Sequence, residues 1–295
     1  MTLDFKKMAE PGGEVHFKRF HPEAIRDYSS ILFAGGKRTG KSSVMREFMW
    51  YLKDRVYDAH IWSGTVDEEH LWEWYTPKQM VHYCLEEFDD DALKAALSTQ
   101  HERKTLARKF GAKCPPSLCV FEDLEFLKPS IWVKQATRGV IFNGRWYKEF
   151  FFVAYQYVME IKMEMRGSFD YAVFTMDCST AVRERIWKQF GGVFKSFEEF
   201  EAVFKMLTTA FSVMVIDLRA RSYDIRDCIF WYRANPNLGS FKMGHPDVWN
   251  SARIRQHAQQ QKQEPAQMIP GMGRIVLLDD TKKKKKKLSK KSRIH

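Results

Sequence analysis

Residues 31–43 read ILFAGGKRTGKSS, and this segment constrains the fold and chemistry of the chain more than any other. Between positions 35 and 42 it has the order glycine, four residues, glycine, lysine, serine. The apolar run 31–34 before it suits a buried strand, and apolar residues recur at helical spacing within 41–53 after it. A strand, a glycine-rich turn and a helix in this order direct backbone N–H groups and the positive end of a helix at an anion. The segment therefore predicts a P-loop that binds the phosphates of a nucleotide.

The P-loop pattern also predicts roles for individual residues. Lys41 is expected to reach the β- and γ-phosphates of ATP and to act in hydrolysis, and Ser42 is expected to bind Mg²⁺. The competing interpretation is a chance match in a glycine turn, and the flanking strand and helix favour the P-loop. The residues predicted to contact the nucleotide are Gly35, Gly36, Lys37, Arg38, Thr39, Gly40, Lys41, Ser42 and Ser43.

A second apolar run, 118–121, ends in two acidic residues, Glu122 and Asp123. In P-loop ATPases a carboxylate at the end of a buried strand supports the Mg²⁺ ion, and in many of them a neighbouring acid polarises the attacking water. We therefore expect Glu122 to act at the metal with Ser42, and Asp123 to act on the water. The usual first acid is Asp, but the longer Glu side chain can still reach a metal-bound water. The alternative is a solvated acidic turn, since Glu125 follows closely.

The composition indicates a globular chain. A length of 295 residues with 44% hydrophobic and 15% aromatic residues can bury the core of one large α/β domain with additions. No apolar run is long enough to span a bilayer, and the first residues contain no apolar signal segment. The cysteines form no CxxC pair, which indicates reduced thiols in a cytosolic or nuclear-type compartment rather than a disulfide scaffold or a zinc site. They are Cys84, Cys114, Cys119, Cys178 and Cys228.

The net charge of +11 is concentrated at the end of the chain. Residues 281–295 hold eight Lys and one Arg with no acid, so removing these nine charges leaves +2 for residues 1–280. Such a run is expected to be extended and solvated, because like charges repel. Non-specific contact with nucleic acid, nuclear import and simple solubility all remain open as its role.

Apolar strands alternate with helices along most of the chain, which predicts an α/β fold with a largely parallel central sheet covered by helices on both faces. From about residue 235 the periodicity is lost, and the Gln-rich segment 256–267 with the following Lys run is expected to be disordered. The expected organisation is an N-terminal extension over 1–27, an ATPase domain over 28–234 and a C-terminal extension over 235–295. The predicted strands are 31–34, 58–64, 80–84, 117–121, 150–154, 171–176, 212–217 and 228–232, and the predicted helices are 41–53, 66–75, 89–110, 129–141, 180–189 and 196–208.

The segment 142–170 narrows the class of ATPase. An Asn143-Gly144-Arg145 turn leads into an apolar strand that ends in Gln156, and Arg166 and Asp170 follow. Together with the GKRTGKS sequence of the P-loop and the acid pair, this ordered set resembles the genome-packaging ATPases of poxviruses and other large nucleocytoplasmic DNA viruses, within the FtsK/HerA-like class. The resemblance covers about residues 28–234. Trp146 departs from it, since the family usually has His there.

The resemblance implies a RecA-like P-loop ATPase that forms a homo-oligomeric ring and pumps double-stranded DNA into a viral capsid, with ATP and Mg²⁺ as cofactors. Gln156 would be a catalytic sensor of the γ-phosphate, with a capped strand end as the alternative. Arg166 would be an arginine finger that acts in a neighbouring subunit, with Arg145 as the second candidate and a surface ion pair to Asp170 or Glu164 as the alternative. A capsid or portal-type protein is the implied docking partner. The implied location is the virion or a cytoplasmic virus factory, with the host nucleus as the alternative.

Two rival functions remain open at this stage. One is a small-molecule P-loop kinase, although no Arg-rich lid is evident in the sequence. The other is a non-catalytic virion DNA-binding protein with a vestigial P-loop. We expect Trp62, Trp72 and Trp74 to pack in the core or an interface rather than to stack on bases.

Overall fold

A computed structural model describes residues 2–3, 15–66, 70–127, 130–156, 163–263, 268–269 and 273–274. The chain divides into two compact units, Met1–Trp249 and Asn250–His295. The first unit contains the central sheet, and the second contains most of α10 (Pro246–Gln263) and a small hairpin of β11 (Met268–Ile269) and β12 (Gly273–Arg274). The predicted Lys-rich tail, 281–295, lies outside the described residues.

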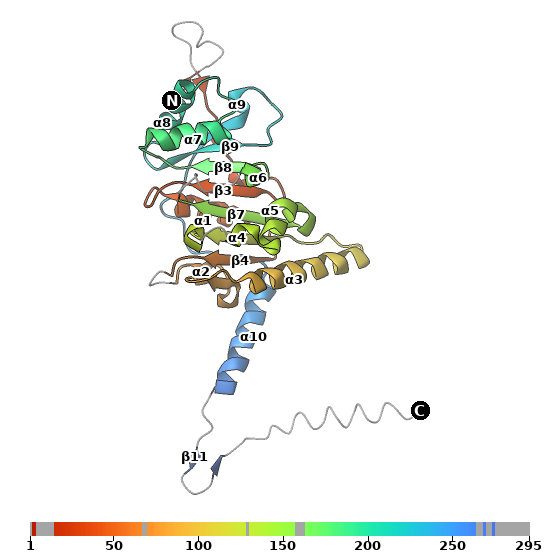
Figure 1. The fold of residues 1–295 in the computed structure, drawn as a ribbon. Coiled ribbons are helices and arrows are strands. Elements are labelled where there is room, and N and C mark those ends of the chain that lie inside the picture. Colours follow the sequence, from red (N-terminus) through yellow and green to blue (C-terminus); the bar gives the residue numbers. More distant parts are fainter. Residues whose placement is uncertain are drawn as a thin grey trace. The chain divides into compact units, whose positions relative to one another are not determined.

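An eight-stranded sheet forms the centre of the first unit (Figure 1). Strands β8, β3, β7, β6, β4 and β5 run parallel, whereas β9 is antiparallel to both β8 and β10. This arrangement confirms the predicted α/β fold with a largely parallel sheet. In spatial order the strands are β10 (Ile229–Arg233), β9 (Ser212–Asp217), β8 (Tyr171–Phe174), β3 (Ser30–Ala34), β7 (Glu149–Tyr155), β6 (Ser117–Glu122), β4 (Asp58–Ser63) and β5 (Val81–Tyr83).

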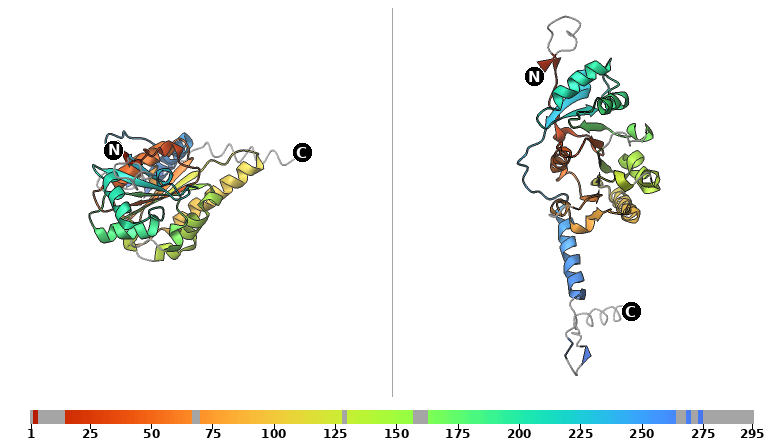
Figure 2. Two further views of the ribbon diagram at one scale, coloured as in Figure 1. Left: turned by 90° about the horizontal axis from the view of Figure 1, so that it is seen from above. Right: turned by 60° about the vertical axis from the view of Figure 1, so that its left-hand side comes forward.

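Helices cover both faces of the sheet, as the right-hand view of Figure 2 shows. One face packs against α1 (Lys41–Leu52) and α2 (Trp72–Tyr75). The other packs against α3 (Asp90–Lys109), α4 (Ser130–Val133), α5 (Gln135–Tyr147), α7 (Thr180–Phe190) and α8 (Phe197–Leu207). The shorter elements are β1 (Thr2–Leu3), β2 (Val15–His16), η1 (Pro22–Ala24), η2 (Lys78–Met80), η3 (Glu125–Leu127), α6 (Met163–Arg166) and α9 (Ile225–Cys228).

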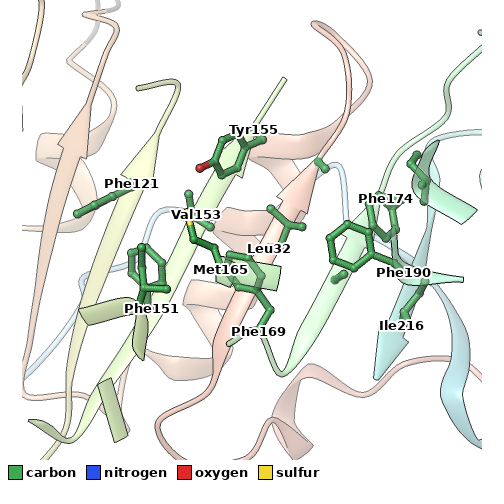
Figure 3. Packing of buried hydrophobic residues seen from close by; sticks show 14 of the residues in the cluster. Leu32, Phe121, Phe151, Val153, Tyr155, Met165, Phe169, Phe174, Phe190 and Ile216 are labelled. Atoms are coloured by element: carbon green, nitrogen blue, oxygen red, sulfur yellow. The ribbon is translucent and has the colours of Figure 1, made fainter. Parts of the chain in front are cut away.

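Strand alternation divides the core into two layers. In β3, Leu32 packs into the layer under α3 to α8, and Ile31 and Phe33 pack into the layer under α1. Figure 3 shows the first layer, where Phe151 and Val153 of β7 lie beside Leu32 and meet Met165 of α6. Every residue of β3, β6 and β7 is buried, which explains why these strands read as continuous apolar runs in the sequence.

The predicted Asn143-Gly144-Arg145 turn was wrong, because all three residues lie inside α5. The helix continues to Tyr147 and ends at Lys148, which takes the left-handed conformation with φ 66°. Gly144 is buried with the apolar stripe of α5, and a Cβ at this position would lie 3.6 Å from the backbone oxygen of Glu149. A contact of this length is ordinary van der Waals packing, so the burial of the apolar stripe of α5, rather than a need for glycine, outweighs the weak helix propensity of Asn and Gly.

Two further expectations needed correction, one on residues 256–263 and one on the helix predicted over 66–75. Residues 256–263, predicted to be disordered, continue α10, whose sequence has Pro at its first position and many Gln, Ala and Arg residues that favour helices. Before α10, the chain still belongs to the first unit: the Met243 N–H donates to the Tyr75 carbonyl at 2.7 Å, and the Phe241 ring lies tilted against the Tyr75 ring at 4.6 Å between centroids. The helix predicted over 66–75 is present only as α2, and residues 67–69 lie outside the described part.

A buried polar cluster lies at the amino ends of β4, β6 and β7. Arg103 donates to Asp58 at 2.6 Å, whereas the fully buried Glu149 carboxyl has Cys119 Sγ at 3.7 Å. In the described part of the chain, no Lys or Arg bonds Glu149. Burial, and next the negative charge of Asp58, raise the pKa of Glu149 well above its usual range.

Glu149→Gln is expected to stabilise the protein at pH 8 by about 1–3 kcal/mol, because the amide keeps the shape of the side chain and has no proton to lose. A carboxyl with a raised pKa in the folded state favours folding below its unfolded pKa, and this contribution is lost as the pH rises toward the folded value. The gain should therefore shrink as the pH falls toward 4.5, the ordinary value for Glu. Urea unfolding at several pH values measures this. An equal stability change at every pH would contradict the assignment.

Candidate active site

The P-loop lies at the carboxyl end of β3, between the ends of β7 and β8. Its glycines are required by the geometry: a Cβ on Gly35 would lie 1.7 Å from Thr175 Oγ1, and Gly40, the N-cap of α1, has φ 94°. Helix α1 then begins at Lys41. The loop therefore presents the N-terminus of a twelve-residue helix at the centre of the sheet edge.

The loop is tied to the neighbouring strand. Thr39 Oγ1 donates to the Gly36 carbonyl at 2.8 Å and lies 2.6 Å from Thr175 Oγ1. Thr175 follows β8 directly, and its N–H donates to the Ala34 carbonyl at 3.1 Å. The Thr39 side chain thus fixes the conformation of the loop, and the contact of Thr39 with the nucleotide stays a prediction.

Lys41 lies against the acid that follows β6. Its ammonium donates to Asp123 Oδ1 at 2.9 Å, and the Lys41 side chain is only 7% exposed. Asp123 takes the left-handed conformation with φ 49°, which turns the chain sharply at the end of the strand. An ammonium has three donors, so Lys41 can hold Asp123 and still donate to phosphate oxygens.

Glu122 is the last residue of β6, and three side chains bond its carboxylate. Ser42 Oγ donates to Oε1 at 3.3 Å, and Ser63 Oγ and Trp72 Nε1 donate to Oε2 at 2.9 and 3.3 Å. Burial, and next the charge of Asp123, raise the pKa of Glu122, while bonds from Ser63 and Trp72 and the charge of Lys41 act in the opposite direction. The donors therefore hold a buried carboxylate in one orientation.

Sequence reasoning missed Ser63 and expected Trp72 only to pack in the core or an interface. Ser63 ends β4 and is paired in register with Glu122, so strand pairing would have identified it. Trp72 is 4% exposed, and its indole N–H bonds the acid as well as packing in the core. The nearby Gly64 allows the Asp123 turn to approach, because a Cβ there would lie 2.0 Å from the Asp123 carbonyl oxygen.

The donor set is suited to Mg²⁺. Ser42 and Glu122 offer hard oxygen ligands side by side at the mouth of the P-loop, which is the chemistry that this ion selects. Among the described residues, no group of three or more His, Cys, Asp or Glu side chains could hold a metal by itself. A Mg²⁺ ion here would therefore share its coordination with nucleotide phosphates and water.

Gln156 follows β7 directly, and β7 lies between the P-loop strand and β6. The carbonyl of the preceding residue, Tyr155, accepts a hydrogen bond from the Gly35 N–H at 3.0 Å. The fold thus brings Gln156 to the same edge of the sheet as Lys41 and Glu122.

The two candidate arginine fingers are separate from this edge. Arg145 bonds Asp170, which also receives Arg219 Nε at 3.1 Å and the backbone N–H of Ser30, the first residue of β3. Arg145 therefore lies at the amino ends of the strands. Figure 1 shows α6, which ends in Arg166, toward the same end of β8.

The two acids predicted as alternative partners of Arg166 each bond other arginines. Asp170 bonds Arg145 and Arg219, and Glu164 bonds Arg138 at 2.8 Å. Burial, and next the positive charge of Arg185, lower the pKa of Arg166. Within one chain, the fold therefore gives neither Arg145 nor Arg166 a place beside the P-loop.

The comparisons with known proteins agree with the fold. No protein-family model matches the chain. Its sequence is 26% identical to the uncharacterised protein 088R of Invertebrate iridescent virus 3 over 73% of this chain and 80% of that one, and 26% identical to the uncharacterised protein L437 of Acanthamoeba polyphaga mimivirus over 72% and 75%. These relatives come from large DNA viruses.

Among solved structures, the genome-packaging NTPase B204 of Sulfolobus turreted icosahedral virus 2, in complex with AMP, matches with a TM-score of 0.50 at 15% identity. The match covers 74% of this chain and 100% of B204. The predicted RecA-like P-loop ATPase fold and the resemblance to viral genome-packaging ATPases are thereby confirmed at the level of structure. In the described part of the chain, no helix combines the length and apolar character needed to cross a membrane.

Proposed function

We propose that this protein is an ATP-driven motor that moves double-stranded DNA into a viral capsid. The observation that carries the proposal is the convergence of the P-loop and the acid pair, with Lys41 bonded to Asp123 at 2.9 Å and Ser42 bonded to Glu122 at 3.3 Å. The shared fold with a genome-packaging NTPase and the relatives in large DNA viruses support the biological role. The proposed site of action is the virion or a cytoplasmic virus factory, with a capsid or portal-type protein as docking partner.

The proposed reaction is in-line attack of water on the γ-phosphate. The P-loop N–H groups and Lys41 hold the phosphate oxygens and stabilise the charge that develops as the bond to ADP breaks. Asp123 orients the water and accepts its proton. Ser42 and Glu122 would hold Mg²⁺, which neutralises phosphate charge when it is bound. Gln156 would bond the γ-phosphate or the water, and would report loss of the phosphate through the Tyr155–Gly35 link.

The arginine finger is proposed to act between subunits of a homo-oligomeric ring. Arg166 is the candidate that the resemblance to packaging ATPases implies, and Arg145, which bonds the buried Asp170 of its own chain, is the second. In a ring, one subunit's Arg166 would reach a neighbour's P-loop and neutralise charge in the transition state.

Arg166→Ala is expected to lower ATP turnover by about 10³-fold or more, the scale of a lost arginine finger. Mixing this variant with Lys41→Ala subunits should restore part of the activity, because some interfaces then combine an intact P-loop with an intact finger. Arg108→Ala on the exposed side of α3 is the matched control and should behave as wild type. No recovery at any ratio, in rings shown to be mixed by native mass spectrometry, would refute the role in trans.

ATP turnover with and without duplex DNA separates the proposal from its two rivals. A packaging motor hydrolyses ATP faster when duplex DNA is present. A small-molecule kinase transfers the phosphate to a metabolite and ignores DNA, and a DNA-binding protein with a vestigial P-loop binds DNA without turning ATP over. Turnover that DNA does not change would refute the motor.

A further inference from the structure

A pocket of about 370 Å³ opens beside the P-loop, on the side of the antiparallel strands. Arg38, Gly40 and Ser43 line it from the P-loop. Phe211, which precedes β9, and Arg233, the last residue of β10, line it from the other side. The side chains proposed to act in hydrolysis, Lys41, Glu122, Asp123 and Gln156, do not line this pocket.

Phe211 has an unusual conformation. Phe211 directly precedes β9 and has a φ of 60°, and the residue before it, Ala210, has a φ of 53°. Phe211 is 69% exposed. A left-handed backbone is unfavourable for a bulky side chain, and an exposed aromatic ring gains little from burial in return. Backbone strain of this kind is concentrated at ligand-binding sites, where a ligand uses the side chain that the strain positions.

The Phe211 ring lies over the phosphate-binding turn. A Cβ on Gly40 would lie 3.7 Å from Phe211 Cδ1, so the ring edge packs over the glycine that caps α1. Arg233 lies beside it, because Arg233 pairs in register with Ser212, the residue after Phe211. In the described part of the chain, no acidic side chain bonds the guanidinium of Arg233 or that of Arg38. The pocket therefore offers one aromatic face and two arginines.

The position of the pocket fits the nucleoside end of a nucleotide. A P-loop fixes the β- and γ-phosphates near Lys41 and Ser42, so the rest of the molecule must leave the loop past the next residue. That residue, Ser43, lines the pocket. Aromatic rings and planar guanidinium groups both stack on nucleobases.

We infer that this pocket receives the nucleobase of the triphosphate, with the base stacked on Phe211 and Arg233. This inference rests on the proposed nucleotide-hydrolysing function. No residue that lines the pocket carries a carboxylate, carboxamide or imidazole side chain that could read the edge of a base. Guanidinium and hydroxyl groups can bond either purine, so selection is by stacking area: ATP and GTP should bind with similar affinity, whereas the smaller pyrimidine of CTP should bind more weakly.

Phe211→Gly tests the base pocket. Glycine suits a φ of 60°, so the variant should fold. Its Kd for Mg·ATP should rise about 10-fold or more, the scale of one lost base stack. Its Kd for inorganic tripolyphosphate, which has no base, should stay within about 2-fold of the wild-type value, because the phosphate site is unchanged. Phe211→Trp should retain tight ATP binding, and Phe110→Ala, at an exposed phenylalanine that caps α3, is the matched control.

The outcomes separate this inference from the function on which it rests. Equal weakening for ATP and tripolyphosphate would show that Phe211 supports the P-loop, and it would overturn the base pocket. Unchanged ATP binding by Phe211→Gly would also overturn it, and would leave the phosphate site intact. Wild-type protein that binds neither ligand would overturn the proposed function together with the pocket.

Discussion

Replacement of Lys41 by alanine is expected to lower kcat for ATP hydrolysis by at least about 10²–10³-fold, the cost of removing one donor from a site that stabilises developing charge. We expect a loss at least this large because Lys41 carries a full positive charge. Its side chain is 7% exposed, so water screens that charge little. Its removal also frees the Asp123 carboxylate, which loses the ammonium at 2.9 Å.

The fold should survive this change. Circular dichroism and thermal unfolding provide the fold control, and Lys53→Ala, at the C-terminal end of the same helix, is the matched variant that should keep wild-type turnover. Hydrolysis by Lys41→Ala within a few-fold of wild type would refute the assignment of the catalytic lysine.

Substitution of Asp123 and substitution of Glu122 are expected to impair ATP hydrolysis in different ways. Asp123→Asn should bind Mg·ATP and lose about 10²–10⁴-fold in turnover, because an amide cannot accept the proton of the attacking water. Glu122→Gln should instead raise the Mg²⁺ concentration needed for half-maximal activity, since Glu122 lies 3.3 Å from the Ser42 hydroxyl and Asp123 lies at Lys41. ATP turnover measured against Mg²⁺ concentration for both variants tests this difference. Identical Mg²⁺ titrations would contradict this division of roles.

Ser63→Ala extends the same test to a residue that the sequence did not indicate. It removes the 2.9 Å hydrogen bond to Glu122 Oε2 without touching Ser42. A raised Mg²⁺ requirement that is smaller than that of Glu122→Gln would support a positioning role for Ser63.

Local sequence patterns predicted the parts of the site that depend on short segments. The P-loop, the acid pair after 118–121 and Gln156 each follow an apolar strand, and parallel strands bring their carboxyl ends to one edge. The strands themselves were predictable, because those buried on both faces read as continuous apolar runs.

The residues that could not be predicted depend on contacts between distant segments. Ser63 reaches Glu122 through strand register, and Thr175 reaches Thr39 across 136 positions of sequence. Phe211 is an ordinary residue in the sequence, and only its left-handed φ and its position over Gly40 distinguish it. The Asn143-Gly144-Arg145 segment was misassigned for the opposite reason, since a local turn signal was outweighed by packing on β7.

Charged residues gather at both ends of the parallel strands, in two separate groups. Asp170 gathers Arg145 and Arg219 at the amino ends of the strands, whereas Lys41, Glu122 and Asp123 meet at the carboxyl ends. Among the described residues, the two candidate arginine fingers, Arg145 and α6 with Arg166, therefore lie toward the amino ends and away from the P-loop of their own chain. This arrangement is the physical reason for proposing that hydrolysis depends on assembly.

Displacement of a third strand from linear duplex DNA tests the central claim most directly. A motor that moves along duplex DNA strips off a triplex-forming oligonucleotide as it passes, and the released strand is measured by fluorescence. We expect ATP-dependent release by the wild-type protein that is absent with Lys41→Ala and with a non-hydrolysable ATP analogue. Hydrolysis of ATP without any release of the third strand, by protein shown to bind the duplex, would contradict the account.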